Sequence, residues 1–174
     1  ASRVRGTTGP AVPPYVAMPQ KLYMTQPTYL GGHHGPFEGG DPSLPDFSAP
    51  HLKVVARMEG NGLIDRRELL GHLDRLRGGL DLGGQLEGTD QFRSLAFQML
   101  TAPAVAEAFD IKRESPVLRE RYGLNLWGQA CLMARRLVEA GVRCITIDHT
   151  NWDTHYDNFN VLKNDLLPHL DSGL

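Results

Sequence analysis

The sequence has only two cysteines among 174 residues, no long apolar run and almost no net charge. Two thiols, Cys131 and Cys144, cannot build the dense disulfide framework of a small secreted domain, and their apolar surroundings favour buried thiols over metal ligands. No stretch reaches the roughly 20 apolar residues that a membrane-spanning helix needs. A net charge of −2, with scattered basic residues, argues against a nucleic acid partner.

The hydrophobic content of 41% is high enough for a packed core. There is no initiating Met, and the last segment, "DNFNVLKNDLLPHLDSGL", carries an apolar helical stripe that stops without a clear terminator. The stripe consists of Phe159, Leu162, Leu166, Leu167 and Leu170. We therefore expect residues 1–174 to be part of a single larger α/β domain.

Proline and glycine are concentrated near the start of the chain. Most of the 12 Pro residues lie within the first 50 positions, where they prevent any regular element from running for long. We expect residues 1–62 to form a Gly/Pro-rich irregular segment on the surface. The composition then changes, and residues 63–141 are expected to be helical.

The longest predicted helix runs from about Asn125 to Ala140, with Gly141 as its left-handed stop. Its inward face is expected to consist of Leu126, Ala130, Met133, Ala134 and Leu137. Shorter helices are expected to start at Asp65, near Thr89, after Thr101 and at Ser115, where Pro116 suits the first helical turn and Gly123 ends the helix.

Residues 142–174 are expected to form a strand, a polar loop and a final helix. The run "VRCITI" at residues 142–147 is almost continuously apolar, as is typical of a core parallel strand that is covered on both faces. The order of helix, glycine, strand and loop indicates an α/β fold, helix-rich and with at least one parallel strand. Ligands of such folds bind at the carboxyl ends of the strands, which is where Asp148 lies.

The loop after this strand is rich in aspartate and histidine. Five of the ten residues from 148 to 157 are of these two types. Asp153 and His155 are two positions apart, so in an extended segment both side chains project to one side and can reach a single cation. A mixed carboxylate and imidazole set suits zinc or manganese better than calcium. Asp148 and His149 are additional candidate ligands at the strand end.

Each of these residues also has a structural interpretation. Asp157 or Asn158 stands where the cap of the final helix is expected. Asp148 could close a turn, and His149 could be an exposed loop histidine. Trp152 is interpreted as a packing residue in preference to a substrate platform.

A second polar cluster, "GGHHGPFEGGD", contains His33, His34, Glu38 and Asp41. It could contact a second metal or a substrate, although glycine-rich surface loops often carry such residues without a function. The sequence has no Gly-x-Ser-x-Gly elbow and no phosphate-binding Gly-Lys-Ser/Thr loop. No nucleophile or other catalytic residue can be named.

The chain resembles the bacterial family catalogued as domain of unknown function 1501. The resemblance rests, in chain order, on "PPYVAMP", "YLGG", "PFEGGDP", "RRELLGHLDRL", "AFDIKRESPVLRERYGLNLWGQACLMARRLVEAGVRCITI" and "NWDTHYDNF". It implies membership of the alkaline-phosphatase-like superfamily, an α/β sandwich of which this chain would be a fragment. It also implies twin-arginine export, hence a periplasmic or otherwise exported protein.

In that superfamily an Asp and a downstream His at the carboxyl ends of the central strands bind one of the metals. The resemblance places these roles on Asp153 and His155, although one residue separates them here where three are usual. The nucleophile would lie upstream of Ala1. The function implied is an exported metal-dependent hydrolase of phosphate or sulfate esters, on a small-molecule or polysaccharide substrate.

Two other functional hypotheses remain open at this point. The protein could be a non-catalytic binding or envelope protein that retains the hydrolase fold. Alternatively, the Asp/His loop could bind nothing, its polar residues serving only as caps and turns.

Overall fold

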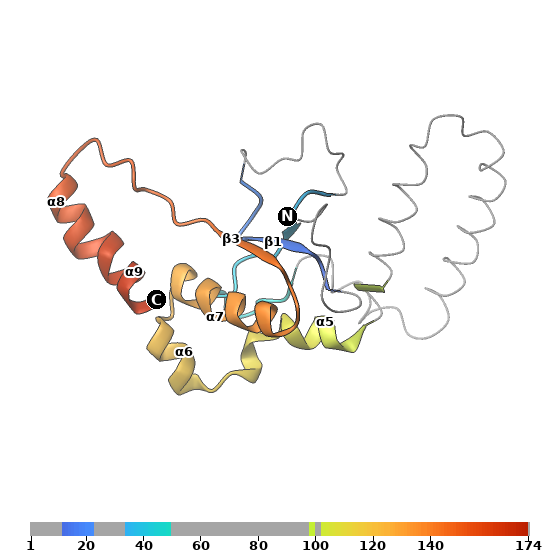
Figure 1. The fold of residues 1–174 in the computed structure, drawn as a ribbon. Helices are drawn as coiled ribbons and strands as arrows, with labels where there is room; N and C mark the ends of the chain where they lie inside the picture. The colour runs from blue at the N-terminus through green and yellow to red at the C-terminus, as the bar shows by residue number, and fades with distance from the viewer. Residues whose placement is uncertain (1–11, 23–33, 50–97, 100–101, 174) are drawn as a thin grey trace, which may run out of the picture.

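A computed structural model describes residues 12–22, 34–49, 98–99 and 102–173. These residues form an α/β fold with a three-stranded parallel sheet in the order β2-β1-β3. Helix α7 packs beneath the sheet, and α6 lies further from the sheet than α7 (Figure 1). The α/β class expected from the sequence is confirmed.

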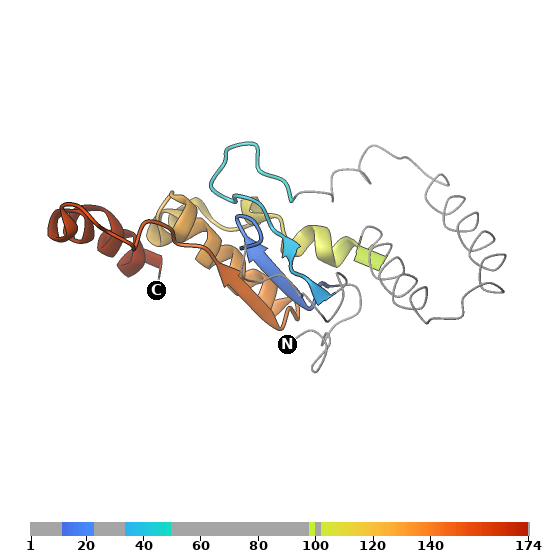
Figure 2. The same ribbon diagram turned by 90° about the horizontal axis from the view of Figure 1, so that it is seen from above.

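The three strands are short, and β1 pairs in parallel with both of the others. Strand β1 (Tyr15–Met18) lies between β2 (Phe37–Glu38) and β3 (Cys144–Ile147), as Figure 2 shows from above. Tyr15 pairs with Cys144 and Met18 with Ile147. Because all three strands run in the same direction, their carboxyl ends meet at one edge of the sheet.

The interpretation of residues 1–62 as an irregular surface segment is wrong for β1. Val16, Ala17 and Met18 are fully buried at the centre of the sheet. The strand is only four residues long and stands between Pro14 and Pro19, so its apolar run is too short to be distinguished from a loop by sequence. The neighbouring strands supply the burial that makes it a core element.

Helix α7 (Leu126–Glu139) supplies much of the core beneath the sheet. Of its five expected inward residues, Ala130, Met133 and Leu137 are fully buried, whereas Leu126 and Ala134 are half-buried. The buried core residues of the described chain are Val12, Val16, Met18, Ala49, Val105, Ala108, Phe109, Ile111, Ala130, Leu132, Met133, Leu137 and Val142.

The helix boundaries predicted from residues 115–141 are confirmed. Helix α6 (Pro116–Tyr122) begins at Ser115, whose Oγ accepts a hydrogen bond from the Leu118 N–H at 3.2 Å. Asn125 caps α7 through the Gly128 N–H at 2.9 Å. Gly123 and Gly141 end α6 and α7 with φ of 90° and 103°, a region that glycine enters without strain.

A further short helix, α5 (Pro103–Ala108), follows Thr101 as expected, and a 3₁₀ turn, η3 (Ile111–Arg113), comes after it. Gln98 and Met99 are helical. The helices expected to start at Asp65 and near Thr89 otherwise lie outside the described residues.

The predicted strand at residues 142–147 is shorter than expected. It begins at Cys144, and all four of its residues are half-buried. The strand is therefore less buried than its apolar sequence suggested, and within the described chain it lies at the edge of the sheet. Val142 precedes the strand and is buried in the core instead.

The final segment contains α8 (Asn158–Val161), a π-helical turn η4 (Leu162–Leu166) and α9 (Leu167–Gly173). The π turn precedes Pro168, whose missing N–H and bulky ring disrupt regular α-helical hydrogen bonds. The π turn widens the angular spacing of the predicted apolar stripe. Leu166 within it is buried, whereas Phe159, which precedes it in α8, is 85% exposed. Within the described residues, no helix has the length and apolarity that crossing a membrane requires.

Candidate functional site

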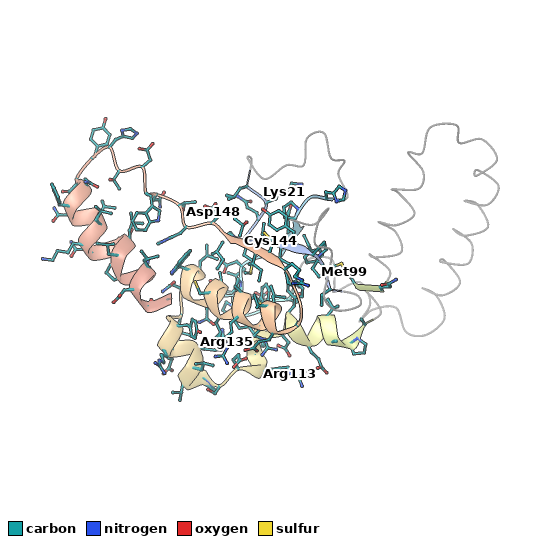
Figure 3. All side chains as sticks on the ribbon, viewed as in Figure 1. Lys21, Met99, Arg113, Arg135, Cys144 and Asp148 are labelled. Atoms are coloured by element: carbon teal, nitrogen blue, oxygen red, sulfur yellow. The ribbon has the colours of Figure 1, made fainter. Side chains whose placement is uncertain are left out.

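The candidate site begins at the carboxyl edge of the sheet. The Asp148 N–H donates to the Met18 carbonyl oxygen at 2.8 Å and so extends the pairing of β3 with β1 by one residue. Figure 3 labels Asp148 where the strand passes into the loop that leads to α8. The sheet therefore determines where this loop starts.

Asp153 and His155 meet in this loop. His155 Nε2 lies 3.0 Å from Asp153 Oδ2, and the side chains are 74% and 90% exposed, respectively. Both side chains therefore project to one side of the segment, as their spacing indicates. In the described ranges no three His, Cys, Asp or Glu side chains are grouped closely enough to hold a metal ion. Asp153 and His155 therefore offer two adjacent polar atoms, fewer than a metal site holds.

His149 is not the exposed loop residue that one interpretation suggested. Its ring stacks on the indole of Trp127 from α7, with centroids 4.5 Å apart and an interplanar angle of 23°. The ring of Trp152 meets His149 edge-on at 5.3 Å and 84°. Both arrangements are favourable for aromatic rings. The structure places His149 in an aromatic stack, with no hydrogen bond to the Asp153/His155 pair.

The surroundings of His149 favour its neutral imidazole. Its Nδ1 is buried and has no hydrogen-bond partner among the described residues. Burial lowers the pKa of His149 below 6.5, and the nearby His169 lowers it further, while Asp165 and Asp148 act in the opposite direction. A neutral ring is the form that stacks on an apolar surface without a desolvated charge.

The stability of the protein should fall as the pH drops below 6.5. The unfolded chain then protonates His149 at its ordinary pKa of 6.5, whereas the folded chain resists protonation, so the unfolded state binds more protons. We expect the free energy of unfolding of His149→Phe to change less between about pH 7 and pH 5 than that of the wild type. Urea titrations at a series of pH values, with a chelator present, measure this difference. Parallel pH profiles for the two proteins would contradict it.

The start of α8 confirms Asp157 as the cap position but not as a capping hydrogen-bond acceptor. Asp157 has a left-handed φ of 49°. Its carboxylate accepts a hydrogen bond from the side-chain Nδ2 of Asn160 at 2.7 Å and none from a backbone N–H of the helix. The Thr154 hydroxyl donates to the Asn158 side chain. These contacts tie the end of the loop to the helix.

Comparison with known proteins identifies a family for the whole chain. A family model described as protein of unknown function (DUF1501) matches residues 2–174. The chain belongs to this family. Searches among curated proteins and among solved structures found no match.

The second polar cluster of this DUF1501 chain is largely accounted for by structural contacts. Glu38 forms an ion pair with Lys21 at 3.3 Å. Asp41 Oδ1 accepts from the N–H and the hydroxyl of Ser43 at 2.8 and 2.6 Å, which closes a turn. His33 lies outside the described residues. The described carboxylates thus have partners that stabilise the loop.

The two cysteines of the DUF1501 chain are half-buried, less than their apolar context suggested. Burial raises the pKa of Cys131 to about 11, so its thiol stays protonated at neutral pH. At neutral pH it therefore carries little of the thiolate form that attacks electrophiles.

The sequence alone did not single out Trp127. It lies in the first turn of α7 and reaches the loop only because α7 packs against β3. One feature of the sequence could have indicated its role: a large aromatic residue in "NLWGQA" that is not part of the predicted apolar face of the helix.

Proposed function

We propose that this DUF1501 protein is an exported, metal-dependent hydrolase of the alkaline-phosphatase-like superfamily, and that Asp153 and His155 bind its divalent metal. The observation that carries the proposal is their 3.0 Å contact in the loop leaving the carboxyl edge of a parallel sheet. The loop starts at this edge, where α/β proteins place their ligands, and runs from it towards α8 (Figure 1).

The chemistry of the pair favours zinc or manganese. A carboxylate oxygen and an imidazole nitrogen are common ligands of both ions. The two side chains are well exposed, so neither must leave a buried partner to reach a cation. A catalytic zinc typically takes three protein ligands and keeps one open position, so at least one more ligand has to come from elsewhere in the protein.

The proposed substrates are phosphate or sulfate esters, either small molecules or polysaccharides. A bound divalent metal would supply Lewis acidity to such an ester. In this scheme Asp153 and His155 would hold the ion. Their hydrogen bond brings the two groups together and would give way on metal binding, because a protonated Nε2 cannot be a ligand. Neither residue is the general acid or base.

Replacing either member of the pair should greatly reduce metal binding. We expect Asp153→Ala and His155→Ala each to lower the affinity of the full-length protein for Zn²⁺ or Mn²⁺ by at least about 100-fold, because each removes a direct ligand where outer-shell changes already cost 10–100-fold. Elemental analysis and calorimetric titration measure the change, and aryl phosphates and aryl sulfates test turnover.

A matched control is available on the final helices. Asp165 and His169 form a second exposed pair, with Oδ1 and Nδ1 3.7 Å apart. Asp165→Ala with His169→Ala should leave metal affinity unchanged. Metal binding that survives the loss of Asp153 and His155, or a full-length protein that takes up no metal, would refute the proposal.

A non-catalytic binding or envelope protein with the same fold is the second candidate. The exposure of the pair favours it, because hydrolases usually enclose their reacting groups in a cleft away from bulk solvent. It predicts metal uptake through Asp153 and His155 without turnover of any ester. The same assays therefore separate the two candidates.

A further inference from the structure

Hydrogen bonds hold the Asp/His loop only loosely to the rest of the protein. After the Asp148 N–H has bonded to Met18, the hydrogen bonds of the loop within the described chain stay local. The Thr154 N–H donates to the Trp152 carbonyl oxygen at 3.0 Å, and His155 pairs with Asp153. The backbone therefore does not fix the direction of the loop, and its side-chain contacts must contribute.

Those side-chain contacts form a chain of three rings. The indole of Trp127 stacks on His149 at 4.5 Å, and His149 meets the ring of Trp152 at 5.3 Å. Trp152 immediately precedes Asp153 in the chain. The rings thus connect the rigid helix α7 to the residue next to the first member of the pair.

Trp127 is itself held from a second side. A Cβ atom added to Gly173 at the end of α9 would lie 2.5 Å from Trp127 Nε1 and 2.8 Å from Cδ1. The backbone of α9 therefore touches the edge of the indole. The ring is confined between α9 and His149 and has little freedom to reorient.

We infer that Trp127 is a positioning residue for the Asp153/His155 pair and acts through the rings of His149 and Trp152. Its effect on metal affinity rests on the proposed function, whereas its effect on the order of the loop does not. Outer-shell residues that orient ligands in this way change metal affinity by about 10–100-fold when they are replaced.

The test compares Trp127→Leu with Trp127→Phe in the full-length protein. Leucine keeps an apolar side chain but removes the aromatic face, whereas phenylalanine keeps a face that can stack on His149. Val138→Ala serves as the control, because Val138 lies on the same helix and is 61% exposed. ¹⁵N relaxation of the amides of residues 150–156 without metal gives the order of the loop, and Zn²⁺ titration gives the affinity.

We expect Trp127→Leu to lower the order parameters of residues 150–156 and to weaken Zn²⁺ binding by about 10-fold or more. Trp127→Phe should keep the order parameters and the Zn²⁺ affinity near the wild-type values, and Val138→Ala should change neither. If the wild type binds no Zn²⁺ but Trp127→Leu still loosens the loop, the positioning role stands and the proposed function fails.

Unchanged loop order in Trp127→Leu, or equal loosening by leucine and phenylalanine, would overturn the inference. Gly173→Ala is a second variant in case Trp127→Leu does not fold. Its added methyl group displaces the indole edge and leaves all three rings present. It should lower the order of the loop in the same direction, and an unaltered loop would also count against the inference.

Discussion

Gly128→Ala should destabilise the protein by at least about 3 kcal/mol, although alanine favours an ordinary helix interior by about 1 kcal/mol over glycine. A Cβ at position 128 would lie 1.8 Å from the Tyr122 carbonyl oxygen and 2.7 Å from that of Gly123. These are backbone atoms at the end of α6 and cannot rotate away as a side chain can. The clash therefore forces α6 and α7 apart.

Urea denaturation of the variant against the wild type measures this effect. Val138→Ala on the exposed face of α7 provides the comparison and should stay within about 0.5 kcal/mol of the wild type. Because Gly128 follows Trp127 directly, Gly128→Ala should also disturb the stack on His149. A variant as stable as the wild type would show that the two helices do not approach as closely as the structure has them.

The elements that could be predicted from the sequence are those with local signals. Ser115, Asn125 and Gly141 mark helix ends through hydrogen bonds or dihedral angles that involve residues a few positions away. Strand β1 has no such signal. Its burial depends on β3, which pairs Tyr15 with Cys144 on the far side of the sequence. No local pattern in a four-residue run can indicate so distant a partner.

The apolar stripe of the final helices illustrates a different limit. Its interpretation assumed 3.6 residues per turn throughout, but the π turn at Leu162–Leu166 has a wider spacing. Pro168 was visible in the sequence and indicates an irregularity, yet it does not say whether the helix kinks, stops or widens. The structure shows that it widens.

The candidate site also has one part that the sequence could predict and one part that it could not. The meeting of Asp153 and His155 follows from their spacing in an extended segment. The stacking of His149 on Trp127 does not, because it requires α7 to pack beside β3. The ionisation of His149 was equally out of reach, since burial and His169 lower its pKa only in the folded chain.

Gln129→Leu should cost about 3 kcal/mol of stability even though leucine has a similar size, because it leaves several buried polar groups without partners. Gln129 is fully buried. Its Nε2 donates to the carbonyl oxygens of Arg119 and Gly123 at 2.9 and 2.8 Å, and its Oε1 accepts from Arg119 Nε at 2.8 Å. The side chain of Gln129, the residue after Gly128, thus joins α7 to the end of α6.

A double-mutant cycle separates the Arg119 contact from the rest of this network. If the 2.8 Å bond couples the two side chains, Gln129→Leu and Arg119→Leu should show an interaction energy of about 1 kcal/mol or more. Arg135→Leu removes an exposed ion pair with Glu139 on the same helix and should change stability far less than Gln129→Leu. Strictly additive effects of the first two substitutions would mean that Arg119 is not held by Gln129. The loss in Gln129→Leu would then come from the two carbonyl groups alone, which would be the contacts through which Gln129 holds the end of α6.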